Sequence, residues 1–265
     1  MNTDLLAAIM AASARVAAEH ERTAGPEVHA ASGRRTPRGA EFRARLAGPG
    51  INVIAECKRR SPSRGILRHP YDPGAIAGGY AAAGAAAISV LTENTFFDGS
   101  LDHLSAVRER VDVPLLRKDF ISTSFQLVEA RAAGADAVLL IAAGLDAGTL
   151  ARLIGEAAAL GLAALVEVHT RQELVRALAA GADLVGVNSR NLKTLEVNLH
   201  VLDEIILGIP AGVTAVAESG LRTAADVGRL RAAGYDAFLV GELLMTTPDP
   251  GGALASLLTL AAGFE

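Results

Sequence analysis

The chain has 265 residues and a formal net charge of −4, which argues against nucleic acid as its main partner. The length suits one large domain or two small ones, and 51% hydrophobic residues with 4% aromatics and no tryptophan predict an aliphatic core. Cys57 is the only cysteine, so no intrachain disulfide can form, no zinc site is indicated, and we expect a protein of the reducing cytoplasm.

The first 48 residues predict a helical extension rather than a targeting segment. Residues 5–20 are rich in alanine, with apolar side chains at helical spacing, which predicts an amphipathic helix. Residues 21–39 are polar and contain many turn formers, so we expect a surface loop there. Residues 41–46 predict a short helix that ends at Gly48-Pro49-Gly50. The first ten residues lack the basic region of a signal peptide.

Short apolar runs and helical segments then alternate along the rest of the chain. The predicted strands are residues 51–57, 86–91, 113–117, 137–142, 164–168, 184–188, 213–217 and 237–240. The predicted helices are residues 72–83, 99–110, 123–133, 147–160, 170–180, 199–207, 223–233 and 252–262. Residues 73–92 carry no charge, but their alanine and glycine content predicts a helix and a buried strand instead of a membrane span.

A local repeat supports this alternation and predicts how the strands are joined. Four predicted helices close with Ala-Ala-Gly, the glycines being Gly84, Gly134, Gly181 and Gly234, about 50 residues apart, and glycine suits a left-handed helix C-cap. Each interval holds two strand–helix units, which predicts a closed (β/α)8 barrel, a TIM barrel. Residues 1–265 then form one domain, with residues 1–48 as its N-terminal helical extension. The alternative, an open doubly wound sheet, normally has a glycine-rich turn after its first strand, and none follows here.

Polar residues lie at the strand ends where barrel enzymes keep their active sites. Glu56 and Lys58 are two residues apart, so they point to one face of the first strand and Cys57 points to the other. A pair of this kind is more often a structural ion pair, but a basic loop at residues 59–65 follows it and suggests an anionic substrate. The later strand ends add Lys118, Glu167, Asn188, Arg190, Glu218, Ser219, Gly220, Gly241 and Glu242. Solvated strand ends do not explain so many converging groups, and an active site does.

The last two strand ends predict a phosphate site. Ser219-Gly220 follows the seventh predicted strand, and Gly241-Glu242 follows the eighth and can open a short helix. Glycines let backbone N–H groups approach a ligand closely, and a helix N-terminus favours an anion. Either loop alone reads equally well as an ordinary turn. Together, at the strands where barrel enzymes often hold phosphate, they favour a phosphorylated small molecule.

Seven segments together resemble the indole-3-glycerol phosphate synthase family, in order, over about residues 50 to 246. They are VIAECKRRSPSRG (53–65), SVLTENTFFDGS (89–100), PLLRKDF (114–120), LVEVHT (165–170), GVNSRNLKT (186–194), AESG (217–220) and LVGELLM (239–245). The resemblance implies a carboxy-lyase of tryptophan biosynthesis. Such an enzyme converts 1-(2-carboxyphenylamino)-1-deoxyribulose 5-phosphate to indole-3-glycerol phosphate, carbon dioxide and water, without a metal or an organic cofactor.

The resemblance also implies catalytic roles. Lys118 is then the general acid that protonates the substrate ketone, and Glu167 is the base or proton shuttle of the dehydration. Lys58 holds the substrate carboxylate, with the division of acid duty between the two lysines left open. Glu56 and Asn188 position the lysines and the substrate hydroxyls. We further expect the two lysines, being near each other, to lower each other's pKa.

The remaining implied contacts are with the substrate. Its phosphate is expected to contact Ser61, Ser219, Gly220, Gly241 and the helix start at Glu242, with Arg190 as a further binding residue. Glu218 lines the mouth near the anthranilate end, and Leu91, Phe97, Phe120 and Leu139 wall the apolar ring site. We also expect the loop at residues 59–65 to be mobile when the site is empty and to close over the substrate.

Other phosphosugar barrels, such as phosphoribosylanthranilate isomerase or a histidine-pathway isomerase, are the alternative. They commonly use Asp or Cys at strand ends, including the first, where this chain has Glu56 and Lys58. A phosphate-binding barrel without catalysis should have lost the lysines, and a flavin-binding barrel should be coloured. As partners we expect a phosphorylated small molecule, neither nucleic acid nor membrane, and a monomer or weak homo-oligomer that can associate with other tryptophan-pathway enzymes.

Overall fold

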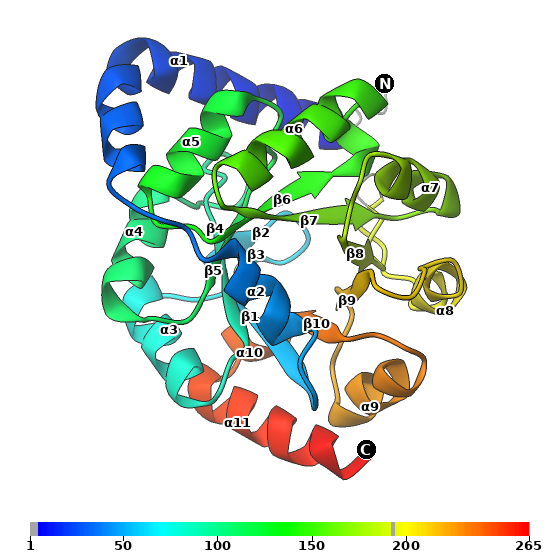
Figure 1. The fold of residues 1–265 in the computed structure, drawn as a ribbon. Coiled ribbons are helices and arrows are strands. Elements are labelled where there is room, and N and C mark those ends of the chain that lie inside the picture. Colours follow the sequence, from blue (N-terminus) through cyan, green and yellow to red (C-terminus); the bar gives the residue numbers. More distant parts are fainter. Residues whose placement is uncertain (1–4, 192–193, 265) are drawn as a thin grey trace.

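A computed structural model describes residues 5–191 and 194–264, and in it eight parallel strands close into a barrel (Figure 1). The order around the barrel is β1-β10-β9-β8-β7-β6-β5-β4. The strands are β1 (Asn52–Cys57), β4 (Ala87–Leu91), β5 (Leu115–Lys118), β6 (Ala137–Ile141), β7 (Ala163–Val168), β8 (Leu184–Asn188), β9 (Thr214–Glu218) and β10 (Ala237–Val240). This confirms the predicted (β/α)8 barrel and excludes the open sheet. Residues 1–4 of the predicted extension, and 192–193 of the segment 186–194, lie outside the described residues.

Helices follow the strands and form the outer layer of the barrel (Figure 1). They are α3 (Pro73–Ala82), α4 (Leu101–Arg110), α5 (Ser124–Ala132), α6 (Ala147–Ala159), α7 (Arg171–Ala179), α8 (His200–Ile206), α9 (Ala224–Ala232) and α11 (Pro250–Ala261), with short turns at η1 (Ala142–Gly144), α10 (Glu242–Met245) and η2 (Ala262–Phe264). Aspartate, serine or threonine side chains cap most N-termini, as Thr123 does for α5. The four repeat glycines have positive φ, as the predicted C-caps require.

The core lies between the helices and the barrel wall, and it continues inside the barrel. Most strand residues are buried on both faces, which is why the strands read as continuous apolar runs. Cys57 is buried with its thiol 3.9 Å from the carbonyl oxygen of Pro73 in α3, so it faces outward from the barrel as predicted. None of the described helices combines the length and apolar character that crossing a bilayer requires.

The N-terminal helix α1 (Leu5–Gly33) is longer than predicted, so the expected loop at residues 21–39 is wrong as far as Gly33. Pro26 lies inside this helix, where it removes a backbone donor and its ring crowds the carbonyl one turn earlier. Packing against α5 outweighs that loss, since the rings of His20 and His29 lie 5.9 and 6.1 Å from the ring of Phe125. Figure 1 shows α1 running beside α5 on the outside of the barrel.

The short helix α2 (Gly39–Leu46) closes the end of the barrel at which the strands begin (Figure 1). Phe42 and Leu46 are fully buried there. The backbone N–H of Gly39 donates to the carbonyl of Gly161 at 3.1 Å, and a side chain at Gly39 would collide with the start of β7. The extension is therefore part of the packed barrel and not an appendage.

A fully buried aspartate, Asp136, fastens the chain between α1 and α2 to the same end of the barrel. Its carboxylate accepts hydrogen bonds from the Arg35 side chain and the Arg38 backbone, both at 2.9 Å. It also accepts from the Arg108 side chain at 3.0 Å and the Leu115 backbone at 2.9 Å. Several donors thus offset the cost of burying this charge.

The basic loop after β1 contains a hairpin that the sequence analysis missed. Strand β2 (Arg60–Ser61) pairs antiparallel with β3 (Gly65–Ile66), so the stretch predicted as a loop contains two short strands. Arg59 forms an ion pair with Asp98 at 2.6 Å, which ties the start of the hairpin to the loop after β4. Movement of this loop on substrate binding stays a prediction.

Candidate active site

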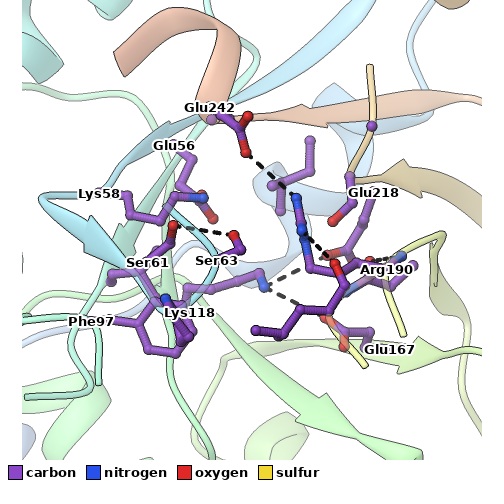
Figure 2. Close-up of a pocket in the computed structure, with 18 of the residues that line it drawn as sticks. Glu56, Lys58, Ser61, Ser63, Phe97, Lys118, Glu167, Arg190, Glu218 and Glu242 are labelled. Carbon is purple, nitrogen blue, oxygen red and sulfur yellow. Dashed lines mark hydrogen bonds and ion pairs between the residues drawn. The ribbon is translucent and has the colours of Figure 1, made fainter. Parts of the chain in front are cut away.

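A cavity of about 330 Å³ opens at the ends of the barrel strands, and every predicted site residue lines it. These residues are Glu56, Lys58, Ser61, Leu91, Phe97, Lys118, Phe120, Leu139, Glu167, Asn188, Arg190, Glu218, Ser219, Gly220, Gly241 and Glu242. They come together because parallel strands in a barrel all end at the same rim. Figure 2 shows the charged members of this set pointing toward one another across the cavity.

The centre of the site is Lys118, at the end of β5. Its ammonium lies 3.5 Å from a carboxylate oxygen of Glu167 on β7 and 3.7 Å from one of Glu218 on β9 (Figure 2). Burial favours the neutral amine, but Glu167, Glu218 and Glu56 together outweigh it and raise the pKa of Lys118 well above its ordinary value. The expected lowering by Lys58 is therefore wrong, because the carboxylates dominate the field at this ammonium.

The two carboxylates beside Lys118 are driven to different protonation states. Burial and the charge of Glu167 raise the pKa of Glu218. Burial acts on Glu167 in the same direction, but Lys118, His169 and Asn188 reverse it and lower its pKa. Near neutral pH the pair therefore holds an ionised Glu167 and a protonated Glu218. A base and an acid then lie on either side of one ammonium.

A glycine in the barrel wall makes this pairing possible. Gly186 of β8 pairs with Glu167 in the β7–β8 register. A Cβ atom at Gly186 would lie 2.0 Å from the Oε1 atom of Glu218. Any side chain there would push the Glu218 carboxyl out of the position that it occupies beside Lys118.

A second acid–base pair lies on β1. The Lys58 ammonium is 2.5 Å from the Oε1 atom of the buried Glu56. Burial favours the protonated form of Glu56, but Lys58 and Lys118 outweigh it and lower its pKa, so this carboxylate is ionised. Gly241 leaves the room for it, since a Cβ atom there would lie 2.3 Å from Oε1 of Glu56. Glu56 thus holds Lys58 in place at the edge of the cavity.

One side of the cavity is apolar. The rings of Phe97 and Phe120 lie 5.8 Å apart and are tilted by 34°. Leu91 and Leu139 lie beside them along the wall. This surface suits a planar aromatic group.

The N-terminal helix completes that wall, which the sequence analysis missed. Leu5, Leu6 and Ile9 of α1 line the same cavity. Their helical spacing was visible in the sequence, but the surface on which the helix packs was not. Pro62, Ser63, Arg222 and Thr246, among others, also line the cavity without having been predicted.

The cavity also has a polar rim that includes Ser61, whose hydroxyl lies 3.4 Å from the hydroxyl of Ser63. Glu242, at the start of α10, accepts from Arg64 of the hairpin at 2.9 Å and lies 3.5 Å from the Arg190 guanidinium (Figure 2). Ser219 and Gly220 have φ angles of 67° and 74°, so the chain turns sharply after β9. Hydroxyl and guanidinium groups on tight loops suit an anionic ligand.

Nothing in this part of the barrel indicates a metal centre. Among residues 5–191 and 194–264, no group of three or more His, Cys, Asp or Glu side chains is placed to hold a metal ion. The arrangement instead offers lysine and glutamate pairs for proton transfer, an apolar wall and a polar rim.

Comparison with solved structures supports the fold. The chain is similar to thiamine phosphate pyrophosphorylase from Pyrococcus furiosus, with a TM-score of 0.61 and 18% identity over 84% of this chain and 98% of that one. It is also similar to N-acetylmannosamine-6-phosphate 2-epimerase from Clostridium perfringens, with a TM-score of 0.56 and 17% identity over 72% of this chain and 86% of that one. At these identities the likeness concerns the barrel alone.

Sequence relatives are much closer than these structures. The chain is 51% identical over 229 residues to indole-3-glycerol phosphate synthase of Mycobacteroides abscessus, covering 86% of this chain and 84% of that protein. It is 54% identical over 216 residues to the enzyme of the same name from Mycolicibacterium smegmatis, covering 82% of this chain and 79% of that protein. The model of the indole-3-glycerol phosphate synthase family matches residues 6–257. With matches of this extent and identity, the chain belongs to the indole-3-glycerol phosphate synthase family.

Proposed function

We propose that the protein closes the indole ring, converting 1-(2-carboxyphenylamino)-1-deoxyribulose 5-phosphate to indole-3-glycerol phosphate, carbon dioxide and water. The observation that carries this proposal is the buried Lys118 ammonium between Glu167 and Glu218, with an apolar wall on one side and an anion-compatible rim on the other. The substrate has the same three parts, an aromatic ring, a reacting ketone and a phosphate. The family to which the chain belongs supports the proposal independently.

Ring closure needs a group that stabilises and protonates the ketone oxygen as it becomes an alcohol. Lys118 is suited to this because its neighbours keep it charged. A positive charge held in a buried site stabilises a developing oxyanion strongly. The alkoxide is a stronger base than the lysine amine, so the proton moves toward the substrate. Lys118 is therefore assigned as the general acid.

Carbon dioxide leaves most readily when the carboxylate is held out of the plane of the aromatic ring. Lys58 can hold it there, because Glu56 anchors the ammonium at the cavity edge. Dehydration then needs a base and an acid. Glu167 is ionised and fits the base, whereas Glu218 fits a proton donor near the anthranilate end. Asn188, on the neighbouring strand β8, is assigned to the substrate hydroxyls.

The apolar wall and the polar rim are assigned to the two ends of the substrate. Phe97, Phe120, Leu91 and Leu139, with Leu5, Leu6 and Ile9, would bind the anthranilate ring. The loops after β9 and β10, with Ser61 and Arg190, would bind phosphate. A crystal grown in sulfate should therefore show an anion between Gly220 and Gly241. An ordered rim with the anion elsewhere would refute this part of the assignment.

We also propose that residues 1–265 form one domain and work in the cytoplasm as a monomer or weak homo-oligomer, with association with other tryptophan-pathway enzymes allowed. The buried free thiol of Cys57 fits a reducing compartment. Sedimentation of the purified chain, alone and mixed with those enzymes, tests the assembly states.

The activity is tested by incubating the purified protein with the carboxyphenylamino-deoxyribulose phosphate and following indole fluorescence. Lys118→Met should abolish most of the signal. The control variant Glu109→Gln, at an exposed glutamate of α4, should not. A wild-type protein that leaves this substrate unchanged but isomerises phosphoribosylanthranilate would overturn the proposal.

A further inference from the structure

Beside Glu167 lies a histidine that the proposed mechanism has not used. This residue, His169, comes directly after β7 and two residues after Glu167. The Nε2 atom of His169 lies 3.3 Å from Oε1 of Glu167. Its side chain is only 13% exposed, and it is not among the residues that line the cavity.

A second carboxylate holds this imidazole from the other side. The Nδ1 atom of His169 lies 3.4 Å from Oε2 of Glu173, in the first turn of α7. The same oxygen accepts the His169 backbone N–H at 2.7 Å, which fixes the glutamate where it meets the ring. Glu173, His169 and Glu167 thus form a line of charges running from α7 to the active site.

The two oxygens of Glu167 therefore face different cations. Oε1 lies next to His169, and Oε2 lies next to Lys118. Glu218 differs, because Lys118 at 3.7 Å is the only cation that its carboxylate meets among the described ion pairs. Two glutamates that share one ammonium thus differ in that only Glu167 also lies beside the histidine.

We infer that His169, backed by Glu173, is a positioning residue that makes Glu167, and not Glu218, the ionised carboxylate beside Lys118. The inference rests on the proposed function, in which ionised Glu167 is the base of the dehydration. The charges around His169 support the inference. Burial favours the neutral ring, but Glu167 and Glu173 outweigh burial and raise the pKa of His169 to about 10, so the ring carries a positive charge at neutral pH. The groups that act on Glu167 from the other strands are Lys118, Asn188, Glu218 and, on β1, Glu56.

Two coupled carboxylates beside one cation hold one proton between them until the pH is high enough to remove it. With His169 present, that proton stays on Glu218. Without its charge, the proton moves to Glu167 in a large part of the molecules, and the base is lost. In the wild type the pair gives up this proton as the pH rises through about 8, and kcat should fall there because Glu218 no longer supplies an acid. Removing the positive charge of His169 makes this proton harder to remove, so the fall of kcat should move to higher pH.

The test compares His169→Gln with wild type from pH 5 to 9. Glutamine keeps a hydrogen-bond donor but removes the charge. We expect kcat of His169→Gln to fall about 10-fold at pH 7, which is part of the usual effect of losing a general base, and KM to change less. We expect the alkaline fall of kcat, which lies near pH 8 in the wild type, to move to higher pH in His169→Gln. His200→Gln, at an exposed histidine of α8, should leave the profile unchanged.

Glu173→Gln provides a second variant that keeps the backbone hydrogen bond and removes the charge behind His169. It should move the alkaline fall of kcat in the same direction with a smaller loss of kcat, and it decides the question if His169→Gln fails to fold. A loss of kcat by one factor at every pH, in either folded variant, would assign His169 a structural role and overturn the inference.

An NMR titration of the imidazole in the free protein requires no substrate. We expect His169 to be protonated still at pH 8 and to lose that state at lower pH in Glu173→Gln. A ring that titrates near pH 6.5 in the wild type would refute the inference even if turnover is normal. An inactive wild type with a protonated His169 would instead refute the proposed function alone.

Discussion

Replacing Glu218 by glutamine should stabilise the protein, and increasingly so as the pH rises. The Glu218 carboxyl is 1% exposed, and folding raises its pKa from 4.5 to about 8 because of burial and the neighbouring Glu167. The protonated form is therefore favoured in the folded chain. The stability that it contributes is fully present below pH 4.5 and is lost as the pH rises through about 8. Glutamine has nearly the same shape and stays neutral throughout.

The size of this effect follows from the pKa shift, since one unit corresponds to about 1.4 kcal/mol. Between pH 5 and pH 9 the unfolding free energy of the wild type should fall by about 4 kcal/mol because of Glu218. Glu218→Gln should not show this fall. For a chain of this size, about 1 kcal/mol moves Tm by roughly 2–4 °C. The difference in Tm between the two proteins should therefore widen by roughly 10 °C over this range.

Thermal unfolding of both proteins, in a series of buffers of constant ionic strength, measures this difference. Glu109→Gln, at an exposed glutamate of α4, should follow the wild type at every pH. The reading of Glu218 as a protonated carboxylic acid would be wrong if the gap between Glu218→Gln and wild type were the same at pH 5 and pH 9.

Three further predictions concern other parts of the molecule. Lys118→Met should lower kcat by about 10²-fold or more with a smaller change in KM, and steady-state kinetics with near-normal kcat would remove Lys118 from the chemistry. Asp136→Asn should lower the unfolding free energy by about 1–3 kcal/mol, measured by urea unfolding, because it removes the charged acceptor of several hydrogen bonds from half-buried arginines and the backbone. An unchanged midpoint would contradict this. If the loop at residues 59–65 closes over substrate, turnover should slow as solvent viscosity rises. Viscosity-independent turnover, with hydrogen exchange in the loop equally slow with and without ligand, would make it a fixed wall.

The arrangement of the active site could be predicted because a barrel converts strand order into spatial proximity. Glu56, Lys118, Glu167 and Glu218 are far apart in sequence, yet each stands at the end of a parallel strand. Once the strands were placed, their ends had to meet at one rim. The exact strand limits mattered little, which is why a strand predicted at 113–117 and observed at Leu115–Lys118 still placed Lys118 correctly.

What could not be predicted depends on contacts between elements. The continuation of α1 through Pro26 requires α5 as a packing surface, and no local pattern shows that surface. The pKa of Lys118 was expected to fall because Lys58 was predicted to lie near it at the same rim. In the structure Glu167 and Glu218 lie within 3.7 Å of its ammonium, and their charges decide the direction. Distances to side chains on other strands are the quantity that the sequence lacks.

The long helix α1 has a consequence for how the enzyme tolerates insertions. Its first turns line the cavity with Leu6 and Ile9, and the chain after its last turn is bound to Asp136 at the opposite end of the barrel. The number of residues between these two attachments fixes the position and rotation of the first turns of α1. One residue inserted near Pro26 would shift the first turns by about 1.5 Å and rotate them by about 100°. The apolar wall would then lose its helical side, so a change remote from every catalytic group could weaken substrate binding.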